Sequence, residues 1–388
     1  FFMSLYTNYF NDIHEQARLT ARQFNEREVL PFINDWEEAG IFPREIYKKA
    51  GDAGLLGVGH DPAYGGTGDD VFLKVAVTEE LMRCGSGGFA ASLGSLDIAL
   101  PPLEKWGSQA LKDKFVPPVL AGDLIAALAI TEPSGGSDVA GLKTRAVRSH
   151  SEEHGDHYVV TGSKTYITSG IRADFYVTAV RTGGPGYAGI SLLLIERSRA
   201  GVSTGTPLKK MGWWASDTAE IFFDNVIVPA ENLIGSENAG FLLIMSNFQM
   251  ERLNLAVMAN MTAQLALEES LRWARERQAF GKHLSQMQII RHKLADMATR
   301  LEASREFTYR VAARIAEGIP SIKEVSMAKN FATQTSDFVT TEAVQIFGGM
   351  GYMRESLVER LYRDNRILSI GGGTYEIMNE VIAKQLEL

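Results

Sequence analysis

The spacing of apolar residues changes twice along this chain, and that change most strongly constrains its fold. Up to about residue 122, apolar residues recur every three or four positions, as at Ile46, Ala50 and Ala53, which predicts amphipathic helices. From residue 126 to about residue 233, short β-rich runs bounded by glycine turns replace this pattern. These runs are residues 157–160, 175–180, 190–195 and 221–223. From residue 240 onward, long helical patterns return, with few breaks before Gly318.

This order predicts an α+β protein with three domains. We expect an N-terminal helical domain over residues 1–125, a middle antiparallel β-sheet domain over 126–235 and a C-terminal four-helix-bundle domain over 236–388. A chain of 388 residues exceeds the usual size of a single hydrophobic core, which agrees with several packed units. The long C-terminal helices have further apolar faces, so self-association is expected.

Composition excludes several classes of protein. The net charge of -8 argues against a general nucleic-acid binder, because such binding needs clustered lysine and arginine. Cys84 is the single cysteine, so neither an intrachain disulfide nor a cysteine metal cluster can form, and we expect it to be a buried thiol. His150, His154 and His157 lack further ligands at suitable spacing, so we expect no metal site. No apolar run reaches membrane-spanning length. We expect a cytoplasmic bacterial protein, and a mature protein of the mitochondrial matrix remains the alternative.

Four segments carry the chemistry of the chain. They are residues 130–138 (ITEPSGGSD), 164–170 (KTYITSG), 277–282 (RQAFGK) and 345–352 (QIFGGMGY). Glycines let a backbone approach a flat ligand, and hydroxyls and free amides can bind ring heteroatoms or phosphate. Taken alone, the first segment is more often a plain turn. A nicotinamide cofactor is not expected, because Gly349-Met350-Gly351 precedes no βαβ pattern and no Walker loop is present.

In this order and spacing, the four segments resemble the acyl-CoA dehydrogenase family from about Asn11 to the C-terminus. The resemblance implies the same order of helical, sheet and helical domains, a homotetramer, and FAD bound between the sheet domain and the bundle. Carried over by position, the residues near the cofactor would be Leu128, Ile130, Thr131, Gly136, Ser137, Tyr166, Thr168, Thr374 and Glu376. A second set would reach the FAD of a neighbouring subunit: Arg277, Phe280, Leu284, Gln288, Gln345, Gly348 and Gly349.

The catalytic base departs from the pattern that most family members share. The family usually carries it in a C-terminal Tyr-Glu-Gly-Thr segment, but residues 371–374 read Gly-Gly-Gly-Thr, so Gly372 occupies the position of the base. The long-chain and isovaleryl branches place the base in a Glu-Arg-Leu sequence on the preceding long helix, which here is residues 251–253. The resemblance therefore implies Glu251 as the base, and the Gly372 N–H as a donor to the thioester oxygen. The structural alternative for Glu251 is a solvated helix residue or an arginine partner.

The resemblance also suggests how the substrate is held. Arg252 would contact the CoA portion, Phe248 would form a hydrophobic wall, and Ser137 would lie along the substrate path. Gly371 replaces a bulky aromatic, which opens space near the acyl α-carbon and favours branched or bulky acyl groups. Glu376 is a second candidate base, but its position matches a nucleotide contact, so we assign it to the cofactor.

The predicted function is FAD-dependent α,β-dehydrogenation of a saturated long- or branched-chain acyl-CoA to the trans-2-enoyl-CoA. The expected electron acceptor is an electron-transfer flavoprotein. Two alternatives stay open at this point: a flavin oxidase or nitroalkane-type enzyme, and a catalytically silent FAD-binding assembly protein on the same scaffold.

Overall fold

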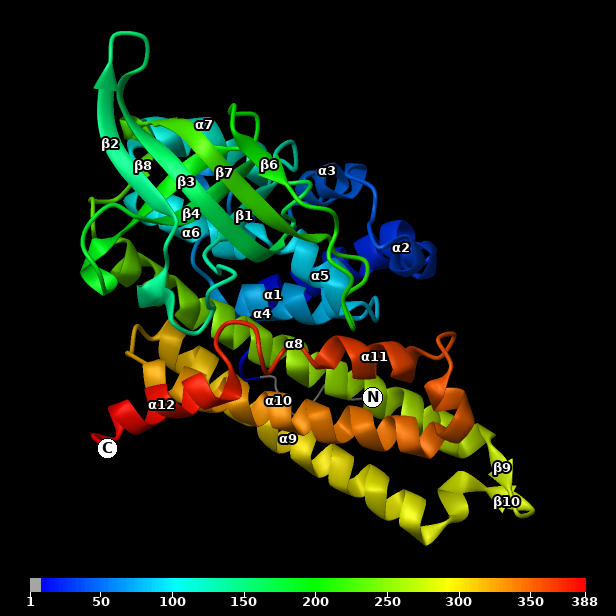
Figure 1. The fold of residues 1–388 in the computed structure, drawn as a ribbon. Helices are drawn as coiled ribbons and strands as arrows, with labels where there is room; N and C mark the ends of the chain where they lie inside the picture. Colours follow the sequence, from blue (N-terminus) through cyan, green and yellow to red (C-terminus); the bar gives the residue numbers. More distant parts are fainter. Residues whose placement is uncertain (1–7) are drawn as a thin grey trace.

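The computed structural model describes residues 8–388 and shows a β-sheet unit above a long helical bundle (Figure 1). Residues 1–7 of the predicted first domain lie outside the described residues. The chain begins with the helices α1 (Asp12–Phe24), α2 (Ile33–Ala39), α3 (Glu45–Asp52), α4 (Val71–Met82), α5 (Gly87–Leu93), α6 (Leu96–Trp106) and α7 (Gln109–Leu120). A π-helical turn, η1 (Asn25–Val29), continues α1.

Side-chain caps fix several of these helix starts. The Asn11 side chain accepts hydrogen bonds from two backbone N–H groups at the start of α1. Asp70 and Ser86 do the same at α4 and α5 with one N–H each. Such caps satisfy donors that have no partner within the helix, so the sequence itself sets where these helices begin.

The middle of the chain forms an eight-stranded sheet with strand order β6-β7-β3-β2-β4-β5-β8, and β1 pairs with β4 outside this path. The strands are β1 (Ala126–Ala129), β2 (Arg145–Ser151), β3 (Gly155–Thr168), β4 (Phe175–Arg181), β5 (Ile190–Glu196), β6 (Val202–Thr204), β7 (Thr218–Pro229) and β8 (Leu233–Ile234). Every predicted β-rich run lies in a strand, and most neighbours are antiparallel as predicted. The exceptions are the parallel pairing of β1 with β4 and a single parallel pair between β2 and β4.

The C-terminal part is built around the 37-residue helix α8 (Gly240–Glu276). It is followed by the hairpin of β9 (Gln278–Ala279) and β10 (Lys282–His283), then α9 (Gln288–Ala316), α10 (Ile322–Phe347), the turn η7 (Gly348–Tyr352), α11 (Leu357–Asn365) and α12 (Tyr375–Gln385). Residues 255–267 of α8 are all buried, because α4, α9, α10 and α11 surround the helix. Within residues 8–388, no helix is both long and apolar enough to cross a membrane.

Asp364 joins all three parts of the molecule. Its buried carboxylate in α11 accepts the Gly87 N–H of α5 at 3.0 Å and the Trp213 N–H of the middle domain at 2.6 Å. Burial, with a further contribution from Glu37, raises the pKa of Asp364 to about 7. These two backbone contacts fix the sheet unit and the first helices relative to the bundle that carries the site.

Candidate active site

The glycine turn between α11 and α12 lies against α8. Gly372 and Gly373 have φ values of +64° and +104°, a backbone region that favours glycine. A Cβ placed on Gly372 would lie 2.7 Å from the Leu255 Cδ1 atom and 3.4 Å from the Glu251 Oε1 atom. A Cβ on Gly371 would meet only the Ile367 carbonyl oxygen, at 3.6 Å, so the space beside Gly371 is open. The structure therefore brings Gly372 to the carboxylate of Glu251.

Glu251 lies on α8, one turn before the fully buried part of the helix. Its Oε2 atom is buried and accepts no hydrogen bond, and its carboxylate makes no ion pair within the described residues. Burial raises the pKa of Glu251 to about 7, against the opposing charges of Arg252 and Lys329. A solvated helix residue or an arginine partner would have neither property, so the structural alternative does not describe this carboxylate.

Two buried cations hold the glycine turn. The Arg252 Nε atom donates to the Gly372 carbonyl oxygen at 3.0 Å, and the Lys329 ammonium donates to the Gly373 carbonyl oxygen. The Arg252 guanidinium also lies 5.7 Å from the centre of the Phe248 ring. Burial lowers the pKa of Lys329 to about 8. In the structure, Arg252 thus binds the glycine turn, and its contact with CoA remains a prediction.

The loop after β1 is held by a buried ion pair. The Lys164 ammonium, with no exposed surface, lies 2.8 Å from the Glu132 carboxylate and donates to the Ile130 carbonyl oxygen at 3.1 Å. Glu132 also accepts the backbone N–H groups of residues 143 and 144. This pair fixes the end of β1 against β3, which leaves Thr131 half-buried and Gly136 and Ser137 exposed. Leu128 is half-buried in β1, and Ile130 is buried.

A bulge in β3 turns an aromatic ring outward beside this loop. The register with β7 shifts between Lys164 and Ile167, and Tyr166 has a φ of +58°. Its side chain is 71% exposed, while Thr168 is half-buried. A bulky residue in this backbone conformation is uncommon, and such strain often accompanies a ligand site.

The second set of predicted cofactor residues gathers at the other end of the bundle. Phe280 is 96% exposed at the tip of the β9–β10 hairpin, which lies far from α12 in Figure 1. The Arg277 guanidinium lies 5.9 Å from the Trp273 ring centre, and Trp273 stacks on Phe347 with centres 4.7 Å apart. These contacts bring the hairpin to the end of α10. Arg277, Gln288, Gln345, Gly348 and Gly349 are exposed there, and Leu284 is half-buried. One chain therefore presents the two sets at separate places.

Thr374 and Glu376 follow the glycine turn. The Thr374 side chain caps α12 by accepting the Ile377 N–H at 3.3 Å. Glu376 lies exposed in the first turn of α12, whereas Glu251 is half-buried and its Oε2 atom is buried. Of the two carboxylates considered as bases, only Glu251 lies in a desolvated position.

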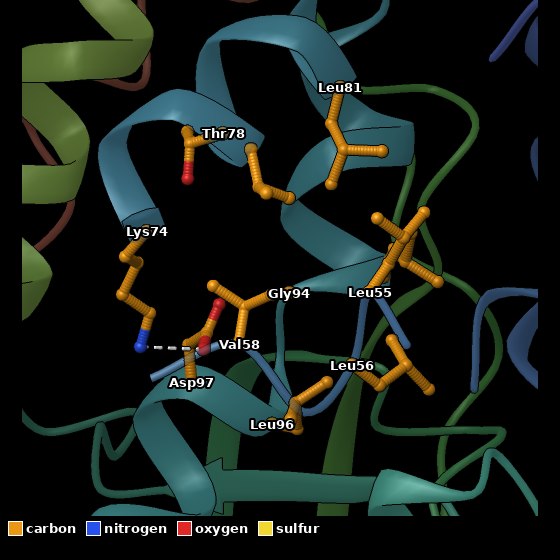
Figure 2. Close-up of a pocket in the computed structure, with 11 residues that line it drawn as sticks. Leu55, Leu56, Val58, Lys74, Thr78, Leu81, Gly94, Leu96 and Asp97 are labelled. Carbon is orange, nitrogen blue, oxygen red and sulfur yellow. Dashed lines mark ion pairs between the residues drawn. The ribbon is translucent and has the colours of Figure 1, made fainter. Parts of the chain in front are cut away.

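Two hollows lie away from Glu251. A cavity of about 30 Å³ in the N-terminal part is lined mostly by apolar side chains, with the 2.8 Å ion pair of Lys74 and Asp97 at its edge (Figure 2). Its lining includes neither Glu251 nor the glycine turn, so it is not the reaction site. A wider hollow of about 710 Å³ lies on the middle domain and is lined by basic residues, among them Lys143, Arg145 and Arg148.

Comparison with known proteins identifies the class. Sequence models of the N-terminal, middle and C-terminal domains of acyl-CoA dehydrogenases match residues 11–123, 127–226 and 238–387. The mouse mitochondrial long-chain specific acyl-CoA dehydrogenase is 37% identical over 386 residues, covering 97% of this chain and 87% of that protein. The protein belongs to the acyl-CoA dehydrogenase family, whose members are FAD-dependent oxidoreductases.

Solved structures agree with this membership. A protein described as a probable acyl CoA dehydrogenase from Mycobacterium abscessus superposes with a TM-score of 0.94 at 52% identity, covering 97% of this chain and 100% of that one. An acyl-CoA dehydrogenase from Bacillus anthracis, complexed with FAD, has a TM-score of 0.91 at 31% identity, covering 98% of this chain and 68% of that one. The predicted fold class is confirmed.

The residues present fit FAD. The outward Tyr166 ring offers a flat apolar surface, and Thr168 beside it carries a hydroxyl. Nothing lies within 4 Å of a Cβ placed on Gly135, so a large ligand can approach that backbone closely. The ion pair of Lys164 and Glu132 holds this surface in place without any ligand.

Lys329 and Lys164 are the residues near the site that the sequence interpretation missed. A lysine is usually solvated, so neither stood out as a buried residue. The available signal for Lys329 was its place within the stripe of Val325, Ala328 and Ala332, all of which are buried. A lysine in such a stripe indicates a buried carbonyl or carboxylate partner.

Proposed function

We propose that this protein dehydrogenates a long- or branched-chain acyl-CoA with Glu251 as the base. One observation carries the proposal: Glu251 has one carboxylate oxygen, Oε2, that is buried and unpartnered, and the Oε1 atom lies 3.4 Å from the place where a side chain on Gly372 would begin. A base in α8 can then reach the space that a base on the glycine turn would occupy. A catalytically silent protein would have no use for a desolvated carboxylate there, because its burial is unfavourable.

The chemistry of the site follows from its charges. A carboxyl with a pKa of about 7 is a much stronger base than an exposed glutamate and is still partly ionised at neutral pH. Glu251 takes the α-proton, and the β-hydrogen leaves with its electron pair. When bound, FAD supplies the acceptor for that hydride. The Gly372 N–H donates to no acceptor within the described residues, so it is available to the thioester oxygen as enolate charge develops.

The glycine turn supports the choice of acyl group. Gly372 places no side chain beside the carboxylate, and the space at the neighbouring Gly371 is open. A branch near the α-carbon, or a bulky chain, can therefore be accommodated. Phe248 lies beside Arg252 on the same side of α8 and would form a wall of this space.

The basic hollow of the middle domain suits the phosphates of CoA. Residues 140–142, three positions after Ser137, form part of its lining. The Arg181 guanidinium is held by four backbone carbonyl groups, those of residues 140, 142, 184 and 186, so it shapes the rim. Lys143 and Arg145 are exposed there and form no ion pair within the described residues. We assign the anionic end of CoA to these two cations.

We further propose that electrons pass to an electron-transfer flavoprotein. A relative from Acetobacterium woodii, 36% identical over 97% of this chain and 99% of that protein, is named a subunit of a caffeyl-CoA reductase-Etf complex. We also keep the homotetramer as a proposal, because the two sets of cofactor residues lie at separate places on one chain and a second copy would bring them together.

Anaerobic titration of the purified flavoprotein with acyl-CoAs of graded length and branching tests this function. We expect flavin bleaching to be fastest with a long or branched acyl-CoA, and reoxidation by an electron-transfer flavoprotein to exceed reoxidation by oxygen. Fast turnover with oxygen alone would indicate an oxidase. No bleaching with any acyl-CoA, despite bound FAD, would refute the dehydrogenase function.

A further inference from the structure

Lys329 is a fully buried cation on α10 whose side chain reaches the turn beside the proposed base. It has no exposed surface, and its ammonium donates to the Gly373 carbonyl oxygen, 44 residues further along the chain. An unpaired ammonium in such a place is strongly unfavourable. A buried lysine therefore needs hydrogen-bond acceptors or a nearby negative charge.

The turn is tied to both central helices at successive positions. From α8, Arg252 binds the Gly372 carbonyl, and from α10, Lys329 binds the Gly373 carbonyl. The next residue of α10, Asn330, donates to the Tyr375 carbonyl at 3.1 Å and to the Asn379 side chain at 3.0 Å. Fixing the carbonyls of residues 372 and 373 fixes the peptide planes that follow Gly372, and this limits the direction of its own N–H.

Lys329 also acts on Glu251 through its charge. The charged groups that act on this carboxylate are Arg252 of α8 and Lys329 of α10, and the glycine turn that covers it has no titratable side chain. Asn330, in contrast, ties the same segment without any charge. The chain thus contains one tether that is a cation and an adjacent one that is neutral.

We propose that Lys329 is a positioning residue for the dehydrogenation. It holds the Gly373 carbonyl so that the Gly372 N–H points toward the thioester, and its positive charge sets the basicity of Glu251. This inference rests on the proposed role of Glu251 as the base.

The test uses the holoenzyme with Lys329→Met, Lys329→Gln and Lys329→Arg, and Asn330→Ala as the matched neutral control. Removing a nearby cation makes a carboxylate harder to ionise, so the acid limb of the kcat profile should move up by about one pH unit in Lys329→Met and Lys329→Gln. At about pH 6 this gives a roughly tenfold lower kcat with KM little changed. Lys329→Arg keeps the charge and should leave the acid limb of the kcat profile at the pH of the parent. Asn330→Ala should also leave this limb unchanged, even if it lowers the stability of the protein.

A second measurement does not depend on turnover. Infrared difference spectra follow the protonated carboxyl stretch of Glu251, assigned by its loss in Glu251→Gln. The titration midpoint of Glu251 should rise in Lys329→Met and in Lys329→Gln. The glutamine of the second variant can still donate a hydrogen bond to the turn, so this variant serves if Lys329→Met does not fold. Equal midpoints in parent and charge-free variants, or an equal rise in Asn330→Ala, would overturn the proposal. If no acyl-CoA reduces the parent flavin, the proposed function fails, and the infrared result still decides whether Lys329 controls Glu251.

Discussion

Replacing Glu251 with glutamine should strongly slow catalysis and stabilise the protein, because the desolvation of one carboxylate accounts for both effects. Burial is the main cause that raises the pKa of Glu251 from 4.5 to about 7. One pKa unit corresponds to about 1.4 kcal/mol, so ionising this carboxyl in the folded protein costs roughly 3 kcal/mol more than in the unfolded chain.

The dependence on pH has a definite sign. Well below pH 4.5 the carboxyl is protonated in both states and has no effect on the free energy of unfolding. As the pH rises, the unfolded chain ionises first, so the folded state loses stability. The loss is complete above about pH 7, where both states are ionised.

Glutamine cannot ionise, so Glu251→Gln should be more stable than the parent at about pH 8, by up to about 3 kcal/mol. The gain should shrink toward zero near pH 4.5. Calorimetry of the two proteins across this range measures the difference. In stopped-flow mixing with a saturating acyl-CoA, flavin reduction should fall more than about 100-fold, because the variant retains the shape of the site but has no base.

Glu376→Gln is the matched control, since Glu376 is an exposed carboxylate just past the glycine turn. It should show no gain in stability that grows with pH. Near-parental flavin reduction by Glu251→Gln would eliminate Glu251 as the base. A stability gain that does not change with pH would show that the burial argument is wrong even if the variant is inactive.

Three further changes test other parts of the site. Gly372→Glu in the Glu251→Gln background should restore only part of the stopped-flow rate, because φ is +64° and the new Cβ would lie 2.7 Å from the Leu255 Cδ1 atom. Adding Leu255→Ala should increase the recovery, and no recovery in either variant would contradict a shared position for the two carboxylates. Arg277→Ala should lose FAD, measured by absorbance, and dissociate the oligomer in sedimentation, because we predict that its guanidinium binds the cofactor of a neighbouring copy. A variant that keeps both properties contradicts the shared site. Lys164→Met should lower the free energy of unfolding by about 3–5 kcal/mol, because it leaves a buried carboxylate without its partner charge, and an unchanged denaturation midpoint would refute this.

The sequence predicted the elements whose pattern is local. Runs of β-forming residues between glycine turns located β3, β4, β5 and β7, and the glycine and proline near residue 318 marked the break between α9 and α10. The parallel pairing of β1 with β4 could not be derived in this way, because its register depends on a partner strand about 50 residues away. The β9–β10 hairpin was also obscured, since its strands have two residues each and no alternation to detect.

For the site, family resemblance and structure contribute different parts. The substitution of Gly372 and the Glu-Arg-Leu sequence implied that Glu251 and Gly372 act together, and the structure places them side by side. It could not be seen from sequence that Arg252 turns back to the glycine turn, or that Lys329 reaches it from α10. Both contacts are made to backbone carbonyl groups. Every residue has such a group, so the residue types in the sequence do not reveal these contacts.

These contacts change how a base in α8 should be understood. A carboxylate on the glycine turn would move with that turn, whereas Glu251 is fixed to a helix that is buried on all sides in its central part. The glycine turn is held by Arg252 of α8 and Lys329 of α10. The charges of these two residues also oppose the rise in the pKa of Glu251 that its burial causes. In the proposed mechanism, the basicity of Glu251 and the positioning of the thioester are therefore coupled through the two central helices. It follows that removing the charge of Lys329 should alter the pH dependence of the reaction, although α10 need not contact the substrate.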